Sequence, residues 1–383
     1  MRARGFTLIE MLVAGAISIF AIAMVTAIFL SQNRTFVSLD LARDATGNGR
    51  DAVLEMETSI KRAGFGIDPA VAFDFTCPVG SNCHDRVNAP DEITFYARNP
   101  QYVWTPQNAA LGCNTAGGCF GGGNIWPITA TTATTIQVTL GANDVIHKGR
   151  ILLAVCANGA SPVFATSTGR VQGPGVMTLN VTINTNAAGI FAGNAFQACH
   201  IGAGSALFLV DKFHYFVTTL AGEPWLVLDT GLDYNQDSTT PPTDVNDLVP
   251  VARDLEDMQV AYQIGPAVNP PFATVPAPDS NTNWVVGDDP GHQEEPSSAA
   301  TPPQGGASSG TLHPGNIRAV RVTLVLRSRS VDTSLAPDAG DAPFTSEDRN
   351  DVTATAASQF KRYPQTFSVA TRNMTAANPY LLF

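Results

Sequence analysis

Charged residues are scarce in this chain of 383 residues. They make up 14% of the sequence, and only 4 of the 22 basic residues are lysines. Such a composition favours a secreted, strand-rich protein over a cytosolic enzyme. The formal net charge is −11, so no nucleic acid is expected as a partner, because binding phosphates requires a basic surface. The length suffices for one large domain or two ordinary ones.

Sequence motifs give little support for catalysis. The chain has no His-Glu-x-x-His, no glycine-rich phosphate loop and no Cys-x-x-Cys, the patterns that mark zinc proteases, nucleotide sites, zinc ribbons and thioredoxin-like sites. Its one Gly-x-Ser-x-Gly, residues 306–310, lies in a proline-rich stretch and not between a predicted strand and helix, the context in which this motif marks a hydrolase. One carboxylate cluster, formed by Asp288, Asp289, Glu294 and Glu295, lies in a segment whose composition predicts flexibility, whereas catalytic carboxylates need rigid placement. We therefore expect neither enzymatic activity nor an organic cofactor.

Proline is absent from the first 68 residues, which favours one long helix there. The run from Met11 to Leu30 carries no charge, and as a helix it would be about 30 Å long, enough to cross a bilayer. A polar and amphipathic helical pattern continues to about Ala63. We expect a membrane-spanning stalk helix over residues 6–64, with Gly47-Asn48-Gly49 as the one place where it could kink or stop early.

Glu10 lies at the start of the apolar run. Two ordinary interpretations of that run are a secretory signal peptide cut near Ala21 to Ala27 and a simple single-span anchor. A carboxylate in such a segment costs about 2.5–3.5 kcal/mol on insertion scales, so it usually has a partner or a function. Glu10 therefore argues against both interpretations.

The segment Gly5-Phe6-Thr7-Leu8-Ile9-Glu10 resembles the signal of type IV prepilins and type II secretion pseudopilins. The resemblance implies that residues 1–5 are a basic leader, that a prepilin peptidase cuts after Gly5, and that the new terminus at Phe6 is methylated. In that family the glutamate at the position of Glu10 is thought to pair with the terminal amine of a neighbouring subunit. A buried charge is costly alone and tolerable when paired, which agrees with that role.

Six cysteines allow 15 pairings. The export signal makes an oxidising compartment, and so disulfides, the favoured interpretation. The simplest pairing joins sequence neighbours: Cys77 to Cys83, Cys113 to Cys119 and Cys156 to Cys199. The alternative is a soft metal site that uses Cys77, Cys83 and Cys199 with the adjacent His84 and His200.

After Gly66 the hydrophobic period changes from helical to alternating, which predicts an α+β protein with an antiparallel, β-rich head. We expect residues 65–205 to be a disulfide-containing insertion or elaborated head, and residues 206–383 to hold the pilin-like sheet. Residues 266–315 contain ten of the 26 prolines and predict a flexible excursion between two strands. The predicted strands are Glu92–Ala97, Thr135–Leu140, Ile151–Val155, Met177–Ile183, Ala206–Val217, Pro224–Asp229, Met258–Ile264, Ala319–Arg329 and Gln365–Arg372.

Two details of these strands are specific predictions. Leu220-Ala-Gly-Glu-Pro224 is the expected turn of a hairpin between the fifth and sixth of them. In the eighth, Val320, Val322, Leu324 and Leu326 alternate with Arg321, Thr323 and Arg327, which predicts one buried face and one wet face.

Three C-terminal stretches resemble minor pilins of the PilW type, which are relatives of the J-type pseudopilins of type II secretion. They are residues 251–262, 316–328 and 367–373; nothing we can name resembles residues 67–205. The resemblance implies a minor pilin of the tip or priming complex, with other pilins, the inner-membrane assembly platform and a PilY-type tip adhesin as partners. It also implies a single pass in the cytoplasmic membrane with a periplasmic head, and later a place at the pilus tip. A secretion pseudopilin and an adhesive head in its own right remain the alternatives.

Asp233, Asn235, Asp237 and Asp244 have the spacing of oxygen ligands in a calcium loop. Ser238 stands where such a loop has glycine, the last ligand is Asp rather than Glu, and strand and proline flank the loop instead of helices. The competing interpretation is a solvated Asx-rich turn. Calcium is thus the one cofactor that the sequence leaves open.

Overall fold

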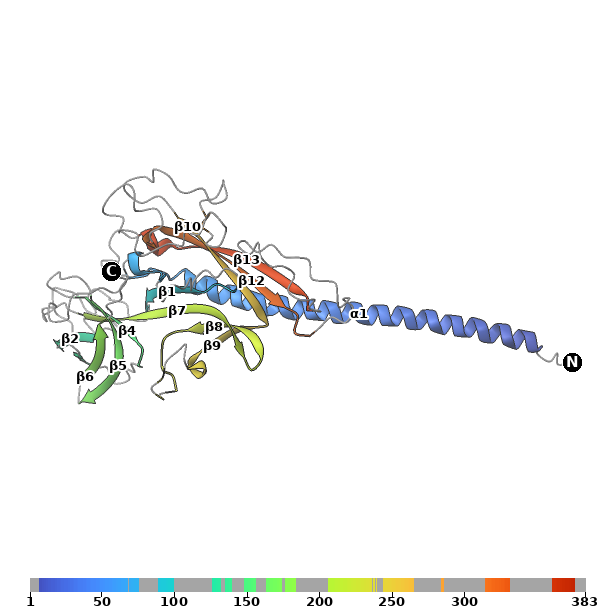
Figure 1. The fold of residues 1–383 in the computed structure, drawn as a ribbon, viewed down its shortest axis with the longest axis horizontal. Helices are drawn as coiled ribbons and strands as arrows, with labels where there is room; N and C mark the ends of the chain where they lie inside the picture. The colour runs from blue at the N-terminus through green and yellow to red at the C-terminus, as the bar shows by residue number, and fades with distance from the viewer. Residues whose placement is uncertain are drawn as a thin grey trace, which may run out of the picture.

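The structure, a computed structural model, describes residues 7–67, 69–75, 89–99, 126–131, 135–139, 148–155, 163–173, 176–183, 206–235, 237, 239, 244–264, 284–285, 314–330 and 360–375. A single long helix and two antiparallel sheets make up this part of the chain (Figure 1). The α+β class that the sequence predicts is confirmed.

Helix α1 runs without interruption from Leu8 to Ile60, a length of about 80 Å at 1.5 Å per residue. Its N-terminal half projects away from the head, and both sheets lie beside its C-terminal half (Figure 1). The predicted bounds were close, but the helix does not stop at Gly47-Asn48-Gly49. Gly49 faces the head, where a Cβ would come within 2.6 Å of the Gln365 side chain, so this glycine accommodates packing and does not end the helix.

The face of α1 that meets the head follows a helical spacing. Its buried apolar and glycine positions recur every three or four residues, which places them on one side of the helix: Leu41, Ala45, Gly49, Ala52, Met56 and Ile60. Ala45, Ala52, Met56 and Ile60 of this set belong to a core shared with both sheets.

The larger sheet has nine antiparallel strands in the order β2-β3-β6-β5-β4-β7-β8-β9, with β1 also paired to β7. It joins strands from both predicted head regions, because β1 and β4, from residues 65–205, pair directly with β7. The strands are β1 (Ile93–Arg98), β2 (Trp126–Thr131), β3 (Thr135–Thr139), β4 (Ile151–Val155), β5 (Val163–Gly173), β6 (Val176–Ile183), β7 (Ala206–Leu220), β8 (Glu223–Asp229) and β9 (Val249–Arg253).

The smaller sheet has four antiparallel strands in the order β11-β10-β12-β13. They are β10 (Leu255–Ile264), β11 (Trp284–Val285), β12 (Ile317–Arg327) and β13 (Arg362–Ala370). The chain passes from one sheet to the other at Asp254, which lies between β9 and β10. Four short 3-10 helices complete the described elements: η1 (Pro69–Val71), η5 (Val245–Asp247), η6 (Pro314–Asn316) and η7 (Arg372–Thr375).

The predicted hairpin is confirmed. Strands β7 and β8 pair from His214–Asp229 to Leu220–Glu223, and the two turn residues Ala221 and Gly222 have φ values of +52° and +86°. Two consecutive residues at positive φ are the signature of a type I′ turn, whose twist matches that of the paired strands.

The prediction for β12 is correct for one face and wrong for the other. Val320, Val322, Leu324 and Leu326 are fully buried, as expected. Thr323, expected to be wet, is only 3% exposed and shares a hydrogen bond of 2.9 Å with Thr366 of β13. Because β12 lies in the middle of its sheet, cross-strand hydrogen bonding allows a threonine to be buried there.

Trp284–Val285 corrects the expectation for residues 266–315. This short strand pairs with Tyr262 and Gln263 of β10. The segment therefore pairs with the sheet at Trp284–Val285, and its residues 314–315 begin η6.

Candidate functional site

The N-terminal half of α1 is apolar and uncovered. The large apolar side chains from Leu8 to Leu30 have exposed fractions between 52% and 83%. Within the described residues, α1 is the one helix long and apolar enough to cross a membrane. An apolar surface this large needs lipid or other protein around it.

The exposed apolar surface continues beyond Arg34, the first charged residue after the uncharged run from Met11 to Leu30. Phe36, Val37 and Leu39 are 70%, 48% and 60% exposed. Contact with the head begins at Ser38, whose Oγ accepts a hydrogen bond of 2.6 Å from Lys361 Nζ. A membrane span needs only about 20 residues, so Phe36 and Leu39 mark apolar surface that continues past that length.

Glu10 lies at the beginning of this surface and closes a capping box with Thr7. The backbone N–H and the hydroxyl of Thr7 donate to Glu10 Oε2 at 2.9 and 2.8 Å, and the Glu10 N–H donates to Thr7 Oγ1 at 3.4 Å. The Thr-x-x-Glu spacing is a recognised signal for such a cap, so this capping box could have been predicted from the sequence. Within one subunit, then, the Glu10 carboxylate already has two donors.

Several predicted site residues lie outside the described residues. They are the cleavage and methylation positions Gly5 and Phe6 and the six cysteines Cys77, Cys83, Cys113, Cys119, Cys156 and Cys199. Leader processing and disulfide pairing therefore stay predictions.

The predicted calcium residues form a hydrogen-bonded turn. Asn235 Nδ2 donates to Asp237 Oδ2 at 3.1 Å and to Asp244 Oδ2 at 2.8 Å. Asp233 is buried, with its N–H bonded to the Lys148 carbonyl at 3.2 Å. In the part of the loop that the structure describes, no three His, Cys, Asp or Glu side chains are placed to hold a metal. Asp247, not predicted, accepts the N–H groups of Tyr234 and Asn235 at 2.9 and 3.1 Å.

Sequence reasoning also missed a polar cluster around His214 on β7. His214 Nδ1 lies 3.0 Å from Asp229 Oδ2, and Nε2 lies 3.0 Å from Glu92 Oε2. Lys212 Nζ reaches Asp229 Oδ2 at 2.8 Å. Burial lowers the pKa of His214, but its hydrogen bonds to the two carboxylates outweigh burial and raise it overall. This arrangement lacks a nucleophile and connects β1, β7 and β8, so we assign it a role in stability.

Comparisons with known proteins add little to this picture. A scan against protein-family models and a search of curated proteins find no match. Among solved structures, a type IV-like pilin from Thermus thermophilus matches at 11% identity, over 60% of this chain and 86% of that one, with a TM-score of 0.18. At that TM-score the superposition carries no argument. The pilin-like architecture rests on the helix and sheets themselves.

Proposed function

We propose that this chain is a minor pilin of a type IV pilus, one that joins the tip or priming complex and presents a large head there. The observation that carries the proposal is the uncovered apolar half of α1, which begins at Glu10 and extends past Arg34. Before assembly this helix would hold the subunit in the cytoplasmic membrane. After leader cleavage it would pack among the helices of other pilins.

A role in assembly explains why the exposed apolar surface exceeds one membrane span. Lipid can cover the first twenty or so apolar residues. Phe36 and Leu39 lie beyond them and are best covered by neighbouring helices, since apolar side chains at helical spacing pack against a partner helix. An enzymatic role has no support in the sequence motifs, and we propose none.

Glu10 would then have two functions: it caps its own helix and meets the amino terminus of a neighbour. Substitutions can separate the two. Glu10→Gln keeps the cap, because Gln also serves at this position of a capping box, but it removes the charge. Thr7→Val removes the capping hydroxyl and keeps the charge. Glu10→Ala removes the charge and also the side-chain acceptor that Glu10 offers to the Thr7 N–H and hydroxyl.

The experiment is co-purification of the full-length chain with its partner pilins from solubilised membranes, with counts of surface filaments. We expect Glu10→Gln and Glu10→Ala to weaken association while Thr7→Val associates like the unmodified protein. Membrane insertion should persist in all three. If Glu10→Gln associates normally and Thr7→Val does not, the carboxylate serves only the cap, and the proposed pairing is wrong.

The identity of the co-purified subunits tests the alternative. A type II secretion pseudopilin of the J type would share the same N-terminal segment and helix. Recovery with secretion pseudopilins, and not with pilus subunits, would move the assignment to that system.

A further inference from the structure

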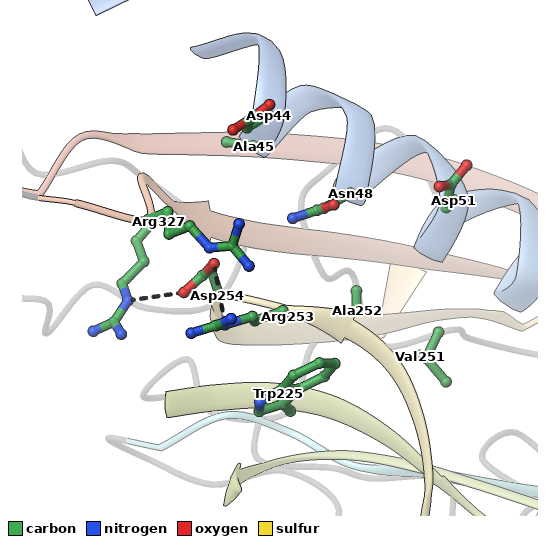
Figure 2. A pocket seen from close by; sticks show the side chains of 11 residues that line it. Asp44, Ala45, Asn48, Asp51, Trp225, Val251, Ala252, Arg253, Asp254 and Arg327 are labelled. Carbon is green, nitrogen blue, oxygen red and sulfur yellow. Dashed lines mark ion pairs between the residues drawn. The ribbon is translucent and has the colours of Figure 1, made fainter. Parts of the chain in front are cut away.

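A recess of about 400 Å³ opens between residues 44–51 of α1 and the strand ends of β8, β9 and β12. Figure 2 shows Asp44, Asn48 and Asp51 along the helix on one side, with Arg253, Asp254 and Trp225 on the other. The recess lies close to Ser38 and Leu41, where α1 first meets the head. Its helix wall therefore belongs to the part of α1 that follows the exposed half, which projects from the head (Figure 1).

Opposite charges face one another across this recess without pairing. Asp44 and Asp51 are exposed on the helix wall, and Arg329 is exposed on the opposite wall. Among the described residues, no ion pair within 4 Å joins the two walls. Exposed complementary charges held apart in this way are available to a partner.

At the floor of the recess, Asp254 lies near Arg253 and Arg327 without forming a hydrogen bond to the Nε of either. Asp254 is 3% exposed, and its carboxylate lies 3.8 Å from Nε of both Arg253 and Arg327, too far for hydrogen bonds. Arg327 is committed to Glu223 by a direct ion pair, whereas Arg253 approaches Glu223 only to 3.9 Å. Arg253 is thus held at longer range, by Asp254 and Glu223 and by the Trp225 ring, whose centroid lies 6.0 Å from the guanidinium carbon.

The backbone at Asp254 supports a contact site here. Its φ of +61° is in the left-handed region, a conformation that costs a non-glycine residue energy and that clusters at binding positions. It places the Asp254 carboxylate between Arg253 and Arg327 in the recess (Figure 2).

The charges of the recess select the kind of partner. An anionic group alone would meet Asp44, Asp51 and Asp254, and a cationic group alone would meet the arginines. A segment that carries one basic and one acidic side chain satisfies both walls. We propose that the recess receives such a loop from the head of a different pilin-type subunit, with its basic side chain toward Asp44 and Asp51 and its acidic side chain toward Arg253 and Arg329.

This inference rests on the proposed function, because the recess faces the end of the molecule that would enter a filament. The test uses the full-length chain with Asp51→Lys and Arg329→Glu, two exposed positions that form no ion pair within 4 Å among the described residues. Asp40→Lys is the matched control, since Asp40 is an exposed carboxylate of the same helix outside the recess. A photo-cross-linking amino acid in place of Asn48, which lines the recess, identifies the chain that occupies it.

We expect Asp51→Lys and Arg329→Glu each to reduce recovery of partner pilins about fivefold to tenfold, in line with the loss of one favourable and the gain of one unfavourable contact. Asp40→Lys should have no effect, and salt should weaken the unmodified complex more than the variants. The cross-link from Asn48 should join a head loop of a different pilin and disappear in Asp51→Lys.

Three outcomes would overturn the inference. If both variants associate normally while Glu10→Gln does not, the proposed function stands and the recess has no part in it. If Asn48 cross-links to a second copy of this chain, or gives no cross-link in an assembled complex, the recess does not receive a loop from a different pilin. If the unmodified chain recovers no pilin at all, the proposed function fails as well.

Discussion

Arg62, just beyond the end of α1, and Asp211 of β7 form an ion pair with 2.6 Å between Nη2 and Oδ2. The other oxygen of Asp211 accepts hydrogen bonds from Arg150 at 2.6 Å and Asn99 at 3.0 Å. The Arg62 guanidinium also lies 4.9 Å from the Phe213 ring centroid. One carboxylate of β7 therefore joins the head end of the helix to the residues that border β1 and β4 in the larger sheet.

Asp211→Asn should destabilise the head by about 2–3 kcal/mol. Removing one partner of a fully buried ion pair costs about 3–5 kcal/mol, and the 31% exposure of the Arg62 side chain reduces that figure. Urea unfolding followed by circular dichroism measures the change. The control is Glu57→Gln, which breaks the exposed pair with Lys61 and should cost less than about 0.5 kcal/mol. Equal losses in the two variants would contradict the assigned role of Asp211.

The His214 cluster predicts a pH-dependent contribution to stability. The folded-state pKa of His214 is raised above 6.5, so its stabilising contribution is complete below that value and is lost as the pH rises through the raised pKa. Comparing the free energies of unfolding of the unmodified chain and His214→Gln should give a larger difference at about pH 6 than at about pH 9. A difference independent of pH would show that the imidazole is not protonated in the folded protein.

The contribution of Asp229 to stability depends on pH in the opposite direction to that of His214. Burial alone would raise its pKa, but His214 and Lys212 lower it to about 2. Its contribution is therefore present above its ordinary pKa of 3.8 and falls as the pH approaches 2. Since Asp229 faces His214, the His214→Gln comparison is best made well above pH 4, where Asp229 stays ionised.

Much of the fold could be predicted because local patterns determine it. The apolar run and the absence of proline define α1, and alternation in β12 identified its buried face. Strand β9 was missed because Pro250 argues against a strand; it is tolerated since β9 is the outer strand of its sheet. Strand β5 was missed because Val163–Gly173 mixes glycine and polar residues without a two-residue period.

Long-range contacts could not be predicted from local patterns. The bond between His214 and Glu92 spans 122 residues and that between Arg62 and Asp211 spans 149, and nothing in a single sequence specifies such register. The recess beside α1 depends in the same way on where β8, β9 and β12 end against the helix. The capping box is different: Thr7 and Glu10 are three residues apart, and their spacing alone indicates it.

Processing at Gly5 can be checked directly. Mass spectrometry of the N-terminal peptide from the mature protein should show methylated Phe6, with residues 1–5 removed. A larger residue in place of Gly5 should block cleavage, because the peptidase in the prepilin family requires a small residue before the cut. A terminus at Met1 or beyond Ala21 would end the prepilin interpretation.

All six cysteines should be oxidised in the exported protein, paired 77–83, 113–119 and 156–199. Peptide mapping without reduction should recover three intrachain bridges, and the loop of 156–199 should contribute the most stability on the chain-entropy model. Free thiols, or zinc that remains bound through purification, would favour the metal alternative.

The hydrogen bonds within the Asx-rich loop argue against a calcium ion there. The Asn235 amide already bridges the carboxylates of Asp237 and Asp244. Thr239 donates from its N–H and hydroxyl to Asp237 Oδ1 at 2.8 and 2.5 Å. A cation between these side chains would have to displace the Asn235 amide hydrogens, which occupy the oxygens it needs.

We therefore expect calcium at about 1 mM, the upper end of the dissociation constants of about 0.1–1 mM of extracellular modules, to leave the melting temperature of the full-length chain unchanged. Ligands that bind only the folded state raise it by mass action, so the measurement is sensitive even to a weak site. Asp237→Ala separates the two interpretations, because Asp237 is exposed and holds only the turn. If calcium raises the melting temperature of the unmodified chain and not of Asp237→Ala, the loop is a calcium site that rearranges on binding. If both respond equally, the ion acts elsewhere on this acidic protein.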